Sequence, residues 1–142
     1  MKRTLFVLLC IALLVLVGCG NQAAPAAAGG GGDAAAGKAL FAQTTIGKSN
    51  SAGCATCHSV EPDKNIVGPS LAGIATDAAG AFSEAGYKGT AKNASEWLHE
   101  QTVNPGLEVV EGFQPDIMPA NYGTELTQKQ LDDIVAYLLT LK

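Results

Sequence analysis

The segment Cys54-Ala55-Thr56-Cys57-His58 carries three side chains whose types and spacing suit one particular chemistry. Two thiols three positions apart can each add to a vinyl group of a porphyrin, which forms two thioether bonds. A histidine directly after the second thiol is then held against the iron as an axial ligand. The segment therefore predicts one covalently attached haem, with Cys54, Cys57 and His58 at the attachment site.

Redox dithiols and zinc sites use similar spacings, but the surrounding sequence favours haem. A redox Cys-x-x-Cys of the thioredoxin kind follows a strand in a βαβ pattern, and no such pattern flanks residues 54–57. A zinc site needs a second pair of ligands, whereas the only other histidine, His99, stands alone. The other cysteines, Cys10 and Cys19, belong to an apolar leader, so no pair remains for a structural disulfide.

The elements that must position this segment are predicted to be helices, and the strongest covers residues 127–141. Thr127 and Gln130 have the spacing of a capping box at its start. Its apolar residues recur with helical spacing, so that they fall on one face. We expect this helix to pack on a core.

Two further helices and a short turn complete the predicted secondary structure. A first helix is predicted over residues 33–44, and Gly37 within it would let another helix cross closely. Another is predicted over residues 94–103, with capping-box spacing at its start and Asn104-Pro105 after its end. Residues 70–76 favour a helical turn. No stretch alternates as a strand would, so the predicted class is all-α, with three to four main helices and long loops.

A second axial ligand to the iron is predicted to come from Met118. This methionine lies just ahead of the terminal helix and is followed by Pro119, so a loop can carry its thioether to the face opposite His58. A lone methionine is otherwise a core residue. His99 lies among Glu96, Glu100 and Gln101 on a predicted solvated helix face, and we interpret it as a structural or surface residue rather than a ligand.

The N-terminus has the pattern of an exported lipoprotein. Lys2 and Arg3 precede an apolar run too short to span a membrane, which indicates a signal peptide over residues 1–18. Leu16-Val17-Gly18-Cys19 resembles the lipobox of bacterial lipoproteins, which predicts lipid attachment at Cys19; the alternatives are an ordinary secretory signal or an uncleaved anchor. Residues 19–36 are rich in alanine and glycine and are predicted to form a flexible tether. Residues 37–142 then form one domain.

The exported chain is acidic. Residues 19–142 contain seven lysines, no arginine and thirteen acidic residues, a net charge of −6. This balance argues against nucleic acid as a partner. Glu108, Glu111 and Asp116 share the loop of Met118 and would suit a basic docking surface, although an acidic balance also serves simple solubility.

These motifs together resemble class I monohaem cytochromes c over nearly the whole predicted domain. The resemblance is carried by Gly37 with Phe41, Cys54 to His58, Val67 to Gly73, Trp97-Leu98, Met118-Pro119, Leu126-Thr127 and Tyr137-Leu138. It implies a cytochrome c fold wrapped around one covalent haem c, with His58 and Met118 as iron ligands. It also implies that the Pro69 carbonyl accepts a hydrogen bond from the haem histidine, and that the first and last helices cross at Gly37 and Tyr137.

The function implied by this resemblance is electron transfer rather than enzymatic catalysis. The chain is also similar, more loosely, to the cytochrome domains of caa-type oxidases and to the monohaem lipoprotein subunit of alternative complex III. We therefore expect an electron carrier, lipid-anchored on the extracytoplasmic (periplasmic) face of a bacterial membrane. Its partner would be a respiratory or photosynthetic complex, such as a quinol-oxidising complex or a terminal oxidase. The alternative is a small-ligand-binding or peroxidatic haem protein with a labile sixth ligand.

Overall fold

The computed structural model describes residues 31–142, so the predicted signal peptide, Cys19 and most of the predicted tether lie outside it. Helices and short connecting elements alternate with long loops, as the sequence predicted. In chain order the elements are α1 (Ala34–Phe41), β1 (Thr45–Ile46), β2 (Ser51–Ala52), the 3-10 helix η1 (Cys54–Thr56), α2 (Ile74–Ala81), α3 (Ala94–Val103), the 3-10 helix η2 (Pro105–Leu107), α4 (Tyr122–Glu125) and α5 (Gln128–Leu138).

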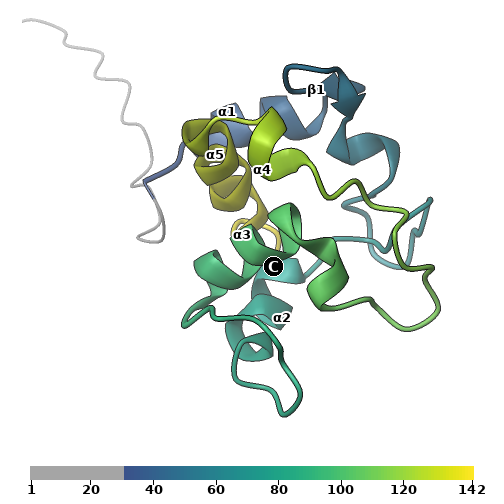
Figure 1. The fold of residues 1–142 in the computed structure, drawn as a ribbon, viewed down its shortest axis with the longest axis vertical. Helices are drawn as coiled ribbons and strands as arrows, with labels where there is room; N and C mark the ends of the chain where they lie inside the picture. The colour runs from purple at the N-terminus through teal and green to yellow at the C-terminus, as the bar shows by residue number, and fades with distance from the viewer. Residues whose placement is uncertain (1–30) are drawn as a thin grey trace, which may run out of the picture.

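The first and last helices cross in close contact, which confirms the predicted crossing (Figure 1). A Cβ atom on Gly37 of α1 would lie 1.8 Å from the carbonyl oxygen of Asp133 and 2.9 Å from the Cβ of Tyr137, so only glycine fits there. The Phe41 ring meets the Tyr137 ring edge-on, with the ring centroids 5.4 Å apart. This geometry is one of the favoured arrangements of aromatic pairs.

The bounds of the terminal and central helices agree closely with the sequence predictions. Thr127 caps α5 in a capping box with Gln130, and the helix ends at Leu138, three residues before the predicted end. Asn93 caps α3 by accepting a hydrogen bond from the Glu96 backbone N–H. The side chains of Trp97 and Leu98 on α3 are buried.

Two local predictions need correction. The first helix ends at Phe41 rather than 44, because the chain turns into an antiparallel hairpin in which Thr45 pairs with Ala52. Its two strands have two residues each, too few to show the alternation by which strands are recognised. The predicted turn over residues 70–76 is instead α2, which begins after Gly73, a residue with a φ of +81°.

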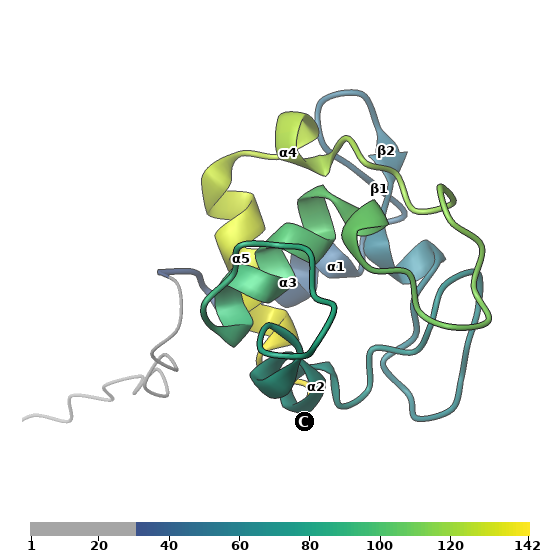
Figure 2. The ribbon, with the colours of Figure 1, turned by 60° about the horizontal axis from the view of Figure 1, so that its bottom comes forward.

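The loops that carry the predicted ligands lie together outside the helices. In both ribbon views, the loop after η1 and the loop between η2 and α4 lie on the same side of the molecule (Figures 1 and 2). The core lies beneath them and is formed by buried side chains of α1, α3 and α5, among them Phe41, Leu98 and Ile134. The C-terminus lies beside α2, where the Ala75 N–H bonds the Leu141 carbonyl.

Residues 31–142 contain no helix with the length and apolar character needed to cross a membrane.

Candidate functional site

The Cys-x-x-Cys-His segment is wound into a tight turn that gathers its three functional side chains. The N–H groups of Cys57 and His58 both donate to the Cys54 carbonyl, at 3.1 and 2.9 Å. The Thr56 hydroxyl donates to the Gly53 carbonyl at 2.6 Å. Both thiols are free and line the same cavity. The turn is therefore compatible with two bonds from neighbouring sulfurs to one planar group.

The ring of His58 is fixed from two directions. Its Nδ1 lies 2.8 Å from the Pro69 carbonyl oxygen, and because a carbonyl can only accept, Nδ1 carries the proton. The other ring nitrogen, Nε2, therefore keeps its lone pair for a metal. A Cβ on Gly68 would lie 2.5 Å from the ring's Cε1, so the backbone supports the ring closely. The bond between His58 Nδ1 and the Pro69 carbonyl is the contact that the resemblance implied for Pro69.

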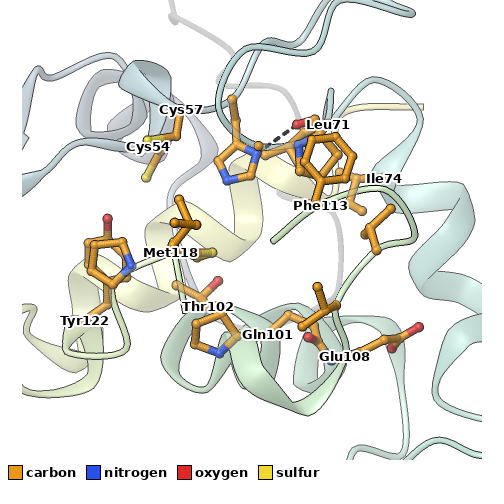
Figure 3. Close-up of a pocket in the computed structure, with 18 of the residues that line it drawn as sticks. Cys54, Cys57, Leu71, Ile74, Gln101, Thr102, Glu108, Phe113, Met118 and Tyr122 are labelled. Carbon is orange, nitrogen blue, oxygen red and sulfur yellow. Dashed lines mark hydrogen bonds between the residues drawn. The ribbon is translucent and has the colours of Figure 1, made fainter. Parts of the chain in front are cut away.

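The sulfur of Met118 enters the same cavity from the loop before α4. Figure 3 shows Met118, Cys54 and Cys57 in one pocket, with Thr102 and Gln101 of α3 nearby. The Met118 side chain is half-buried and packs against the core. The structure thus brings together five of the six site residues named from the sequence, namely Cys54, Cys57, His58, Pro69 and Met118. The sixth, Cys19, lies outside the described residues.

The cavity between these residues has a volume of about 730 Å³. That size falls within the range of pockets that enclose cofactors. Much of its wall is apolar and comes from elements throughout the domain, including Leu71, Ile74, Phe113, Ile134 and Leu138. The donor set, the fixed histidine and the apolar wall fit a haem. A haem site also explains why the apolar side chains of Val67, Val109, Val110 and Ile117 are exposed, since all four line this cavity.

The electrostatics of the cavity are dominated by carboxylates. Asp77, Glu84, Glu108 and Asp116 line it, and none of the described residues around it is a lysine or an arginine. The Trp97 indole N–H donates to the Glu108 carboxylate at 3.3 Å. These carboxylates make the cavity mouth acidic, in keeping with the net charge of the domain.

Two groups beside the cavity have raised pKa values because burial disfavours their charged forms. Burial raises the pKa of the Cys54 thiol to about 11, and a nearby Cys57 adds to the shift, so both act against a free thiolate. Burial likewise raises the pKa of Tyr122 to about 12, and its hydroxyl donates to the Ala52 carbonyl at 2.6 Å. Tyr122 is therefore a neutral hydrogen-bond donor throughout the physiological pH range.

The prediction for His99 was wrong in one respect. Its ring is half-buried rather than solvated, and Nε2 is buried with no hydrogen-bond partner in the described part of the chain. His99 is not among the residues that line the cavity.

Sequence reasoning did not name Tyr122, placed Gln101 on a solvated helix face, and named Glu108 only as a docking residue, although all three line the cavity. The Gln101 amide nitrogen is buried and has no hydrogen-bond partner within residues 31–142. A signal existed for Gln101, because it lies four residues after Trp97 and therefore shares its helix face. Tyr122 had none, since its partner Ala52 is 70 residues away in the sequence.

The comparisons with known proteins agree with this geometry. The family model for cytochrome c matches residues 34–142. A cytochrome c2 from Rhodopseudomonas palustris is 34% identical over 127 residues, covering 78% of this chain and 99% of that protein. A cytochrome c from Euglena viridis is 32% identical over 110 residues, covering 78% of this chain and 98% of that protein. The chain belongs to the cytochrome c family. It has the all-α fold of that family, binds one covalent haem c and is an electron carrier rather than an enzyme.

Proposed function

We propose that this cytochrome c holds its haem through Cys54 and Cys57, binds the iron through His58 and Met118, and passes electrons between redox partners at a membrane. The bound haem supplies a one-electron Fe(III)/Fe(II) couple. The observation that carries the proposal is the single cavity into which both thiols, a histidine of fixed tautomer and one thioether converge.

In this proposal His58 and Met118 divide the control of the iron between them. The Pro69 carbonyl draws on the Nδ1 proton of His58, which strengthens Nε2 as a donor. A thioether is a soft, neutral ligand, so Met118 favours the ferrous form and raises the potential relative to a second histidine. With both axial positions filled, the iron has no place for a substrate.

The membrane attachment is proposed from the N-terminal sequence. Cys19 ends a lipobox-like run, and the alanine- and glycine-rich residues that follow it reach to the start of α1. One acyl chain binds a membrane only marginally, whereas a multiply acylated cysteine anchors a protein stably. The domain would then face the extracytoplasmic, periplasmic side of a bacterial membrane.

The proposed partner presents a basic surface. Glu108, Glu111 and Asp116 are exposed in the loop that leads to Met118, and two of them line the cavity mouth. Complementary charge would orient the cavity toward a redox protein such as a quinol-oxidising complex or a terminal oxidase. Exposed charges are screened over about 10 Å at 0.1 M salt, so electron transfer should slow as salt rises.

One feature favours a second function, in which the iron binds small molecules. Between Glu108 and Ile117, a single backbone hydrogen bond joins Phe113 to Val110, and most side chains are exposed. A loop held so lightly could release Met118 and open the sixth position. Absorption spectra recorded with carbon monoxide at neutral pH distinguish the two functions, because only a labile ligand yields readily.

Haem staining after denaturing electrophoresis tests the attachment. We expect a stained band for the wild-type protein and none for the double variant Cys54→Ala/Cys57→Ala, since only thioether bonds survive denaturation. His99→Ala serves as the control and should keep the stain. Staining that persists in the double variant would refute attachment through these cysteines.

Fractionation of the same cells tests the membrane and partner parts of the proposal. Cys19→Ser should move the haem protein from the membrane to the soluble fraction, or stall its maturation. From solubilised membranes, the wild-type protein should co-purify with a redox complex. An unmodified Cys19 in the mature protein, seen by mass spectrometry, would contradict lipid attachment while leaving the haem site unaffected.

A further inference from the structure

The hairpin of β1 and β2 is joined to α4 by a set of hydrogen bonds that bridges distant parts of the chain. We call this set the clasp. The Tyr122 hydroxyl donates to the Ala52 carbonyl at 2.6 Å, and the Ser49 N–H donates to the Glu125 carboxylate at 2.6 Å. Three more bonds complete it: Asn121 Nδ2 to Ser51 Oγ at 3.0 Å, Lys48 Nζ to the Thr124 carbonyl at 3.1 Å, and Lys48 N–H to the Glu125 carbonyl at 3.3 Å.

The clasp connects the two segments that meet at the haem cavity. Ala52 lies two residues before Cys54, and Tyr122 lies four residues after Met118. Tyr122 is buried, with 5% of its surface exposed, and its side chain lines the cavity with Cys54 and Met118 (Figure 3). One hydrogen bond from a cavity residue therefore ties the haem-attachment turn to the segment that returns from Met118.

The hairpin is shaped for this contact. Ile46 of β1 is buried, which fixes the hairpin on the core. Gly47 has a φ of +81°, and a Cβ there would lie 2.8 Å from the Cβ of Glu125. Only glycine combines that backbone conformation with so close an approach. The turn is thus built to press against α4, and it is fixed at its base by the Gly53 N–H bond to the Thr44 carbonyl.

On the other side of Met118 the chain has no comparable attachment. Residues 108–117 make one backbone hydrogen bond, from Phe113 to Val110, and the Trp97 indole bond to Glu108 holds only their beginning. Asp116, two residues before Met118, is exposed and has a φ of +62°. The position of the Met118 sulfur therefore depends mainly on the segment that follows it, which is the one the clasp holds.

We propose that the clasp positions Met118 at the iron, with Tyr122 and Glu125 as its positioning residues. This inference rests on the proposed ligation by Met118. Neither residue is a proposed iron ligand; they would restrict the return path of the ligand loop so that the thioether stays across the cavity from His58. Loss of the clasp should leave the haem attached and the helices formed, while raising the fraction of molecules in which the sulfur has left the iron.

The test is a competition between Met118 and added imidazole in the full-length, oxidised, haem-loaded protein. It is followed by the weak far-red absorption that a sulfur–iron bond gives in the oxidised state and that is lost when imidazole replaces the sulfur. Tyr122→Phe keeps the ring and removes the bond to Ala52. Since one hydrogen bond contributes about 0.5–1.5 kcal/mol, the apparent affinity for imidazole should rise about two- to tenfold. Glu125→Ala should act in the same direction, whereas Glu125→Gln keeps an acceptor for the Ser49 N–H and should stay near wild type.

Tyr87→Phe is the matched control, because it removes the same atom elsewhere. Tyr87 lies in the loop between α2 and α3, and its hydroxyl donates to the carboxylate of Glu100 on α3, away from the clasp. This variant should lower the melting temperature and leave imidazole affinity unchanged. If Tyr122→Phe and Glu125→Ala change that affinity no more than Tyr87→Phe does, the clasp has only a structural role and the inference is wrong.

Met118→Ala separates this failure from failure of the proposed ligation. It should bind imidazole without competition and lack the far-red band. If it keeps the wild-type band, Met118 is not the ligand, and the proposed function fails in that part. If it loses the band while the clasp variants match the control, the ligation stands and only the clasp is refuted.

Discussion

The loop that follows η1 and the loop that leads to Met118 flank the same cavity but are held in different ways. In the first, Val67 and Gly68 both bond the Cys57 carbonyl, Leu71 bonds the Ser59 carbonyl, and the Ser70 hydroxyl bonds the Glu61 carbonyl. The second has one internal backbone bond over residues 108–117. One proposed ligand is thus fixed by its own neighbourhood, and the other by a contact with a distant hairpin.

This difference shows that the two ligands proposed for one cofactor can be held by different kinds of contact, one local and one between distant segments. His58 is supported by short-range bonds that form with the turn itself, so its geometry follows from a few residues. Met118 depends on Tyr122 and Glu125 reaching a hairpin about 70 residues earlier in the chain. Stability of the fold and retention of the sixth ligand should therefore respond to different substitutions.

The largest effect should come from crowding the His58 side. In Gly68→Ala the new Cβ would lie 2.5 Å from the His58 ring, and overpacking of this kind costs about 1–3 kcal/mol. The melting temperature should fall, and the spectrum of the haem should change with the displaced ring. Thermal unfolding monitored in the haem bands measures both.

Gly80→Ala is the control for that experiment. Apart from its chain neighbours and the backbone of its own helix, nothing in residues 31–142 lies within 4 Å of the position a Cβ would take at Gly80 in α2, so alanine should stabilise the helix by up to about 1 kcal/mol. A Gly68→Ala protein as stable as wild type, with an unchanged spectrum, would show that the His58 side is less rigid than its contacts indicate.

A smaller loss of stability is expected from a substitution at the contact between α1 and α5. The buried Asp133 carboxylate accepts from the Asp33 backbone N–H at 2.7 Å and from Lys129 at 2.8 Å, and these bonds, in that order, lower its pKa. Asp133→Asn should cost about 1 kcal/mol at pH 7, because a charged acceptor is lost. The far-red absorption should not change, since α1 and α5 carry neither ligand.

The pH dependence of this effect has a definite sign. A carboxyl whose pKa is lower in the folded state stabilises the fold at pH values above its unfolded pKa, and this contribution is lost as the pH falls through the folded pKa. The difference in the free energy of unfolding between wild type and Asp133→Asn should therefore have its full value at pH 7 and should shrink as the pH falls below about 4. A difference that persists unchanged at pH 3 would mean that the charge is not its source.

The smallest effect should distinguish the two halves of the Met118 loop. Pro119 follows the ligand on the side held by the clasp, whereas Pro115 precedes it in the lightly held half. Replacing a proline by glycine costs about 0.4–1 kcal/mol through the added freedom of the chain. Pro119→Gly should raise imidazole affinity about two- to fivefold, and Pro115→Gly should raise it less. The reverse order would place the restraint on Met118 before the ligand rather than after it.

The sequence predicted what depends on short spacings. The haem-attachment segment, the capping box at Thr127 and the close crossing at Gly37 were each indicated by a few neighbouring residues, and the structure contains all three. The family match then confirmed the all-α cytochrome c fold and the covalent haem. Local chemistry of this kind leaves a pattern because the interacting residues are close in the chain.

What the sequence did not predict depends on contacts between distant residues. The hairpin has strands of two residues, and α4 has one turn, so neither has room for a period. The bond from Tyr122 to Ala52 and the burial of the His99 ring nitrogen arise only when separate elements meet. For that reason the surroundings of His58 could be predicted in detail, whereas the contacts that hold the Met118 segment could not.

The most direct test of the proposed site is the midpoint potential and far-red absorption of wild type compared with Met118→His. Wild type should show the weak sulfur-to-iron absorption when oxidised. The variant should stay six-coordinate, lose that absorption and have a substantially lower potential, because imidazole stabilises Fe(III) relative to a thioether. An unchanged potential and spectrum in Met118→His would show that another residue binds the iron, and would contradict the assignment of Met118 as the sixth ligand.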